Sequence, residues 1–99
     1  MFRGTTTIIE MNLDIDTSLI EKMYVTFVQK NDIKFEKEAC DCSFNGTTAS
    51  VQLTQEETLG LTAGEPLKVQ VRCKLTDGSV IASKVEVLRV EDVFNEEVI

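Results

Sequence analysis

Apolar and polar residues alternate along most of this chain with a period of two. In the first clear stretch, Ile9, Met11 and Leu13 alternate with polar side chains, and Ile15 continues the apolar series. Successive side chains of a β-strand point to opposite faces, so this pattern predicts a strand with one buried and one hydrated face. Such strands are typical of antiparallel sheets that cover a core on one side only.

Five further segments have the same alternation or a strand-rich composition. The longest lies at 67–75, where every second residue is apolar, and we expect it to be the central strand. Asn45-Gly46 and Asp77-Gly78 are dipeptides favoured in tight hairpin turns, and they separate neighbouring segments. The remaining expected strands are residues 22–29, 33–38, 49–53 and 80–90.

Three details refine this assignment. The strand at 33–38 carries charges on one face, which is typical of an exposed edge strand. In the strand at 80–90 we expect Val85 and Val87 to face the core, with a change of phase before Leu88. Short helical turns are expected after Asp16 and after Thr54, because both residues can cap a helix at its N-terminus.

These elements predict a single domain, residues 1–99, that is all-β. We expect an antiparallel, immunoglobulin-like β-sandwich of six or seven strands with one short helical turn, and at most two, because a single sheet would leave its apolar face in water. A small barrel is the structural alternative. The expected core residues are Leu13, Val25, Phe27, Val51, Val69, Val71 and Val85.

The charge balance narrows the classes of partner. Seventeen acidic and ten basic side chains give a formal charge of −7, which repels phosphate backbones and anionic lipids. We therefore expect neither nucleic acid nor a membrane as a partner, and no apolar run approaches the ~20 residues of a membrane helix. The first residues lack the apolar stretch of a secretion signal, which favours synthesis and use inside a cell. The acidic charge serves solubility or docking on a basic protein surface.

Side chains suited to catalysis or metal binding are sparse. The chain has no histidine, the commonest general base and metal ligand. Cys40 and Cys42 lie two positions apart, where extended α-carbons are about 6.6 Å from each other, near the outer limit for a disulfide. Cys73 lies in an apolar series, so we expect three free thiols of which Cys73 packs as a small apolar side chain.

Carboxylates are the other candidates for chemistry. Glu10, Asp14 and Asp16 lie on one strand face and in the turn that follows, and their oxygens could hold calcium. They lack the dense ligand spacing of an EF-hand, and successive acids on a wet face are usually only hydrated charge. We expect no catalytic residue, no cofactor and no metal, and therefore no enzyme.

Three stretches together resemble a family of small proteins encoded in bacteriophages and prophages of Firmicutes. Arg3-Gly4-Thr5-Thr6 is similar to the Arg-Gly-Thr-Thr-Pro start of that family, although Thr7 stands where proline is usual. Leu53-Thr54-Gln55-Glu56-Glu57-Thr58-Leu59 resembles its most recognisable segment. Leu75-Thr76-Asp77-Gly78, the following Ala82-Ser83 and the closing Val98-Ile99 complete a similarity that covers nearly the whole chain.

The resemblance implies a structural or assembly role. Family members look like neighbours of tail and other virion genes, and the architecture is similar to β-domains of phage tails and baseplates. We expect a non-enzymatic module that contacts another virion component or further copies of itself, in the bacterial cytoplasm during assembly or in the virion. The alternative is a β-sandwich that binds a small ligand, carbohydrate or calcium.

Two segments are candidate contact surfaces. The expected edge strand could pair with a strand of a partner by backbone hydrogen bonds. The last residues mix acids with apolar side chains, and we expect them to enter a neighbouring subunit or a virion partner rather than pack on their own domain. The candidate interface residues are Ile33, Phe35, Glu36, Val93, Phe94, Val98 and Ile99.

Overall fold

The computed structural model describes residues 1–83 and 85–99. It contains eight strands, one α-helix and two single turns of 3-10 helix in that part of the chain. The strands are β1 (Thr7–Asn12), β2 (Ile20–Gln29), β3 (Asp32–Glu38), β4 (Cys42–Asn45), β5 (Thr48–Leu53), β6 (Leu67–Leu75), β7 (Val80–Ala82) and β8 (Glu86–Leu88). The helical elements are Thr17–Leu19, Ala39–Asp41 and α1 (Gln55–Leu59).

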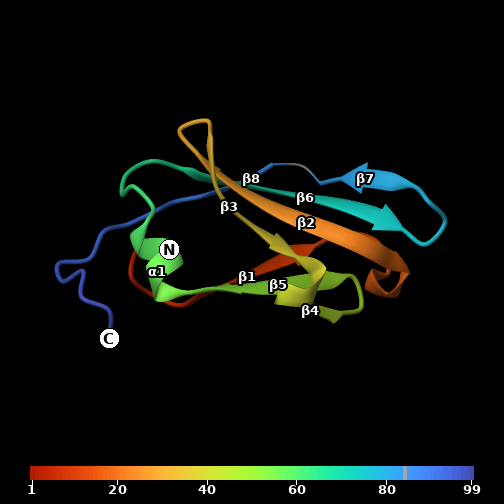
Figure 1. The fold of residues 1–99 in the computed structure, drawn as a ribbon, viewed down its shortest axis with the longest axis horizontal. Coiled ribbons are helices and arrows are strands. Elements are labelled where there is room, and N and C mark those ends of the chain that lie inside the picture. Colours follow the sequence, from red (N-terminus) through yellow and green to blue (C-terminus); the bar gives the residue numbers. More distant parts are fainter. Residues whose placement is uncertain (84) are drawn as a thin grey trace.

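The strands form two antiparallel sheets. One has the order β1-β5-β4, and the other has the order β3-β2-β6-β7, with β8 also paired to β6. In Figure 1, β2 and β6 cross the upper part of the molecule, and β1 and β5 cross the lower part. These two orders correspond to strands B-E-D and C′-C-F-G of an immunoglobulin sandwich, so the expected all-β sandwich is confirmed.

The core lies between the sheets and is built from the apolar phase of each strand. Of the seven expected core residues, Val25, Phe27, Val51, Val69 and Val71 are buried as expected. Leu13 is only partly buried, because β1 ends at Asn12 and Asp14 has a positive φ that turns the chain away. The largest fully buried apolar side chains also include those of Met23, Leu53 and Leu67.

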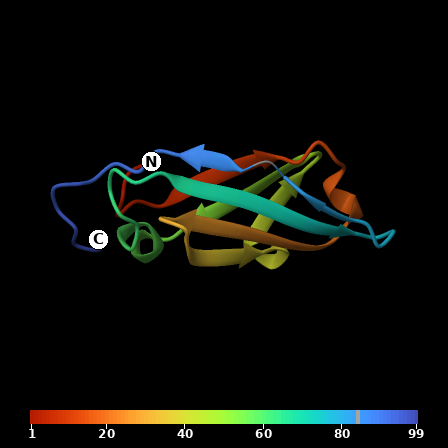
Figure 2. The ribbon, with the colours of Figure 1, turned by 90° about the horizontal axis from the view of Figure 1, so that it is seen from above.

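The expected central strand is confirmed as β6. It pairs with β2 on one side and with β7 and β8 on the other, and Leu67, Val69, Val71 and Cys73 are all buried. Its outward side chains lie on the exposed surface of the five-stranded sheet, called the outer face below. The molecule is elongated, with extents of 47 × 27 × 17 Å, and β6 runs along the long axis (Figures 1 and 2).

The expected strand at 80–90 is two short strands, and the phases expected for Val85 and Val87 are wrong. Ile81 pairs with the buried Cys73, whereas Leu88 pairs with the buried Leu67. The inward phase therefore moves from odd to even positions between β7 and β8. Val85 and Val87 are 50% and 61% exposed as a result.

The edge position expected for residues 33–38 is confirmed, but one face assignment is wrong. Phe35 pairs with Phe27 and Ile33 pairs with Val28, so one extra residue, Lys34, interrupts the ladder between them. Phe35 therefore stacks on the core ring of Phe27, with ring centroids 4.6 Å apart. The bulge turns Ile33 to the outer face, where it is 62% exposed.

The segment 91–99, called the tail below, forms none of the named strands. Its start is fastened to the N-terminal residues: Arg3 N donates to Glu91 O at 2.9 Å, and Glu91 N donates to Met1 O at 2.8 Å. This contact is an isolated parallel bridge between Phe2 and Glu91. Both chain ends therefore lie at the α1 end of the molecule, as Figure 1 shows.

Candidate functional site

The guanidinium group of Arg3 joins three segments at the α1 end. It donates to Asp92 Oδ1 at 2.6 Å and to Glu96 Oε1 at 2.7 Å, which fixes the tail in two places. It also donates to the carbonyl oxygen of Leu59 at 2.8 Å, at the C-terminal end of α1, where the helix dipole favours a cation. Arg3 thereby holds the tail against the helix.

Helix α1 is short and depends on side chains at its N-terminus. The Thr54 hydroxyl accepts from Glu57 N, and Glu57 Oε1 accepts from Thr54 N at 2.8 Å, which is the expected capping box. Glu57 also pairs with Lys37 of β3 at 2.8 Å. The Thr58 hydroxyl is buried and donates to Thr5 O at 2.9 Å. The Arg3-Gly4-Thr5 and Leu53–Leu59 stretches, distant in sequence, therefore pack on one another.

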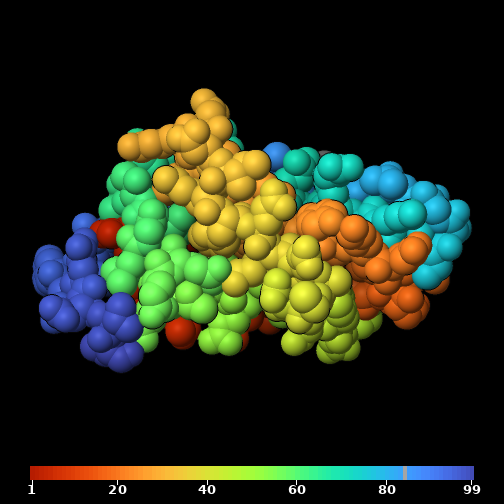
Figure 3. Space-filling model, viewed as in Figure 1, coloured from red at the N-terminus to blue at the C-terminus, as the bar shows by residue number. Residues whose placement is uncertain are grey.

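Backbone groups at the two ends of the tail are hydrogen-bonded, whereas most of its apolar side chains are exposed. Gln55 of α1 donates to Ile99 O at 2.8 Å and accepts from Ile99 N at 2.9 Å. Yet Phe94 is 111% exposed and Ile99 is 98% exposed, while Val98 is also exposed and Val93 is half-buried. Figure 3 shows the tail as a lobe that projects from the α1 end. The tail thus presents apolar side chains on an ordered backbone.

The other candidate contact surface, the free edge of β3, lies on the opposite side of α1. Lys37 of β3 reaches Glu57 of the helix, whereas the tail reaches Gln55. The structure therefore places Glu36 and Ile33 on an exposed edge and Phe94 on the tail as two separate surfaces. Phe35 is only partly available, because its ring packs on Phe27.

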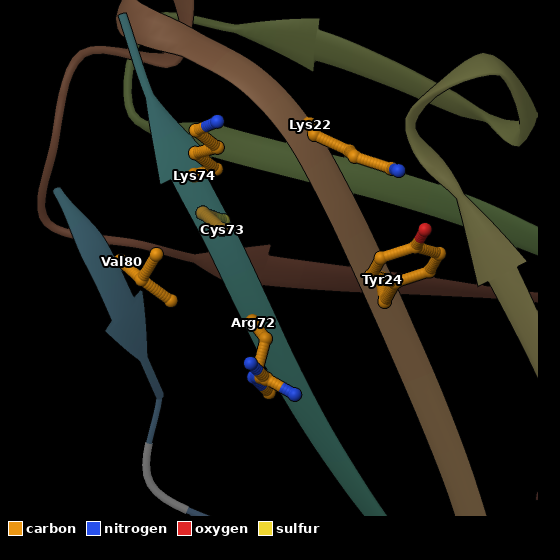
Figure 4. Close-up of a pocket in the computed structure, with 6 residues that line it drawn as sticks. All are labelled: Lys22, Tyr24, Arg72, Cys73, Lys74 and Val80. Atoms are coloured by element: carbon orange, nitrogen blue, oxygen red, sulfur yellow. The ribbon is translucent and has the colours of Figure 1, made fainter. Parts of the chain in front are cut away.

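A third feature is a hollow of about 180 Å³ on the outer face, called the basic hollow below. Its outward side chains come from three neighbouring strands, as Figure 4 shows. Lys22 pairs across the ladder with Lys74, Tyr24 pairs with Arg72, and Val80 pairs with Lys74. The residues that line it are Lys22, Tyr24, Arg72, Cys73, Lys74 and Val80.

The basic hollow concentrates positive charge on an acidic protein. Among the described residues, no carboxylate lies within ion-pair distance of Lys22, Arg72 or Lys74. The ammonium group of Lys22 lies 5.3 Å from the centroid of the Tyr24 ring, and a hydrogen bond with the Tyr24 side chain raises the pKa of Lys22. Glu38, which pairs across the ladder with Tyr24, contributes a smaller electrostatic effect in the same direction.

The three cysteines are free thiols in the structure, as expected. Burial raises the pKa of Cys73 and, with nearby charges, that of Cys42, so both favour the protonated form, which is a poor nucleophile. The Cys42 thiol donates to Glu38 O at 3.4 Å, and Cys40 is exposed. Cys73 belongs to the core and Cys42 packs against it, whereas Cys40 does not.

Of the three acids proposed as calcium ligands, Glu10 is exposed on β1 and Asp16 caps a turn. Asp16 Oδ1 accepts from Ser18 N at 3.0 Å and caps the turn Thr17–Leu19, and this hydrogen bond lowers the pKa of Asp16. Asp14 lies at a position with φ 56° after β1. In residues 1–83 and 85–99, no three cysteine or acidic side chains form a group that could hold a metal ion.

Sequence reasoning missed two features that the structure brings together. The outward phase of Lys22 and of Arg72 and Lys74 was visible, but the pairing of β2 with β6 was not, so the basic hollow was not foreseen. Gln29 is fully buried, and its side chain bonds the backbone of Thr62 and Glu65. The sequence signal for this burial was that Gln29 lies in the inward phase of β2.

Comparisons with protein-family models, with curated proteins and with solved structures found no match to this chain. No helix among the described residues is long and apolar enough to cross a membrane.

Proposed function

We propose that this chain is a non-enzymatic structural or assembly module of a phage or prophage particle, and that it works by protein–protein contact. The observation that carries the proposal is the tail: Arg3 bonds the side chains of Asp92 and Glu96, and Gln55 bonds the backbone of Ile99, while the side chains of Phe94 and Ile99 are exposed. The resemblance to small phage and prophage proteins supports the same role.

An ordered tail is suited to binding for an energetic reason. Association costs about 0.5–1.5 kcal/mol for each flexible side chain that becomes ordered, and loop ordering adds to this cost. Because the tail backbone is already fastened to α1, a partner meets Phe94 in a defined place. Exposed aromatic side chains that enter a partner's pocket commonly dominate the energy of an interface.

The edge of β3 offers a second way to bind. Its outer side is unpaired, because β3 is the last strand of its sheet. A partner strand can add there by backbone hydrogen bonds, with Ile33 as an apolar contact on the outer face. The charges of Lys34 and Glu36 and the bulge at Lys34 restrict this edge to partners that match them.

The alternative, binding of calcium or carbohydrate, has less support. Calcium takes six to eight oxygen ligands, and the described residues form no cluster of three acids. The basic hollow, of about 180 Å³, is smaller than the ~300–1,000 Å³ of pockets that bury small-molecule ligands, and two hollows partly lined by α1, of about 330 and 320 Å³, lie at the lower limit of that range. Tyr24 is the single aromatic side chain of the basic hollow.

The proposed function can be tested by complementation of a prophage from which the gene has been deleted. A tail variant carries Phe94→Ser, Val98→Ser and Ile99→Ser. A control variant carries Ile8→Ser, Leu19→Ser and Val87→Ser, which removes exposed apolar side chains outside the tail. Infectious titre and the composition of purified particles are measured after induction.

We expect deletion to lower the titre, the control variant to restore it, and the tail variant to fail although its thermal melt matches that of the wild type. An unchanged titre after deletion, or full restoration by the tail variant, would overturn the proposal.

A further inference from the structure

The tail and the basic hollow are complementary in chemistry. The tail has four acidic side chains and no basic one, together with Val93, Phe94, Val98 and Ile99. Asp92 and Glu96 are engaged by Arg3, whereas Glu97 has no ion pair among the described residues. The hollow offers three unpaired cations around an aromatic ring and Val80. An aromatic ring with an acid three positions later suits such a surface.

The size of the basic hollow also fits one large side chain. At about 180 Å³ it is too small for most ligands, but it can receive a ring such as that of Phe94. A ring placed there contacts Tyr24 and Val80, and it lies beneath the positive charges of Lys22 and Arg72. A cation over the face of an aromatic ring is attracted by the negative charge of that face.

The two surfaces lie at opposite ends of the same molecule. The tail lies at the α1 end, whereas Lys22, Lys74 and Val80 lie near the hairpin that joins β6 to β7, at the other end of the 47 Å long axis (Figures 1 and 2). Held by Arg3 at the Asp92 side chain and by Gln55 at the Ile99 backbone, the tail does not reach the hollow of its own copy. A second copy can supply the missing partner.

We propose that the tail of one copy docks on the basic hollow of a second copy, with Phe94 on Tyr24 and Val80 and with Glu97 facing Arg72 or Lys74. This inference rests on the proposed function, because it names a partner for the tail. The contact is heterologous, because it joins the tail of one copy to the basic hollow of the next, so the two copies contribute different surfaces. Such contacts close into rings or extend into filaments.

A single contact of this kind is weak. Stable interfaces bury about 1,200–2,000 Å² in total, more than one side chain and its neighbours supply. The net charge of −7 on each copy opposes association further. Closure of a ring makes the last contact intramolecular and strengthens the whole assembly. We therefore expect association that depends strongly on protein concentration.

The test uses the full chain and two variants, each of which lacks one surface. The hollow variant carries Arg72→Glu and Lys74→Glu, and the Phe94 variant carries Phe94→Ser alone. Molar mass is measured by light scattering after size-exclusion chromatography across a concentration series. We expect oligomers of the wild type, and monomers of each variant alone. The two variants mixed in equal amounts should form a heterodimer and nothing larger, because each retains the surface that the other lacks.

A charge-matched control separates local contact from general repulsion. Lys30→Glu with Lys68→Glu changes the net charge by the same amount as the hollow variant, but both residues lie outside the hollow. We expect this control to assemble like the wild type. Thermal melts of all variants confirm folding.

Three outcomes would overturn the inference. A wild type that stays monomeric at every concentration would do so, as would a hollow variant that assembles normally. Binding of an oligonucleotide to the hollow in place of self-association would assign this surface to nucleic acid. In each case the proposed function survives if the tail variant still fails in the prophage assay, so failure of the inference is distinguishable from failure of the function.

Discussion

The middle of the sandwich and its α1 end are held together in different ways. In the middle, Val25, Val51 and Val71 pack between the sheets and contribute free energy in proportion to the apolar area they bury. At the α1 end, Arg3 and Gln29 bond to backbone groups of other segments. Apolar packing accepts many partners, whereas each polar bond requires one. The alternation of apolar and polar residues in the sequence predicts the apolar packing, but it does not predict the polar bonds.

A charged side chain placed in the middle of the sandwich should lower its stability more than any other change considered. Val71→Asp places an unpaired carboxylate in a position that is 3% exposed, which costs several kcal/mol against a typical total stability of about 5–15 kcal/mol. We expect the domain to unfold or to melt far below the wild type in urea. Lys68→Asp, on the outer face of the same strand, should cost less than about 1 kcal/mol. Equal midpoints for the two variants would contradict the assigned phase of β6.

At the α1 end, we expect the loss of one amide side chain, that of Gln29, to destabilise the fold. Gln29→Leu removes three hydrogen bonds of 2.8–3.0 Å to Thr62 and Glu65 and leaves their backbone groups without those partners. An unsatisfied buried group costs about 1–3 kcal/mol, so we expect a loss of about 2–3 kcal/mol in urea melts. Faster hydrogen exchange at the Thr62 amide should accompany it. Gln52→Leu on the exposed side of β5 is the control, and a comparable loss there would refute the assignment.

The smallest of the three effects should come from Glu57 and should depend on pH. Burial raises the pKa of Glu57, but hydrogen bonds from Lys37 and Thr54, with the charge of Lys37, outweigh it and leave this pKa below the ordinary value of 4.5. The folded state therefore resists protonation more than the unfolded state does. This stabilisation is present above pH 4.5 and is lost as the pH falls through the lowered folded pKa.

The matching experiment compares urea melts of Glu57→Gln and wild type from neutral pH to below pH 4.5. We expect a loss of about 1 kcal/mol at neutral pH that shrinks in acid, because both proteins then lack the carboxylate charge. Glu56→Gln, one position earlier and exposed, should change little. A difference that is constant with pH would show that the charge of Glu57 is not involved.

The pattern of the sequence predicted the fold where side chains alternate without interruption. The phases of β5 and β6, the capping box at Thr54 and the edge position of β3 were all confirmed. The faces predicted for individual side chains were wrong where a strand gains or loses a residue relative to its partner. Lys34 reverses the face of Ile33, and the change of phase between β7 and β8 exposes Val85. A bulge changes the register without changing local composition, so the alternation alone does not show its position.

The candidate surfaces were predicted less completely, for a different reason. The interface role of the tail stays a prediction from its mixture of acids and apolar residues, and in the structure Arg3 bonds the side chains of Asp92 and Glu96 while Gln55 bonds the backbone of Ile99. The basic hollow depends on the pairing of Lys22 with Lys74, which are far apart in sequence. Such a pairing is a property of the sheet order, which no single segment specifies.

The position of β6 between β2 and the last strands also determines when the protein can fold. Val25 pairs with Val71, and Ile9 pairs with Val51, so the partners in the β2–β6 and β1–β5 ladders lie nearly half the chain apart. Domains dominated by such distant pairs fold in milliseconds to seconds, whereas ribosomes add about 5–20 residues per second. The ladder between β2 and β6 therefore cannot form before β6 has left the ribosome.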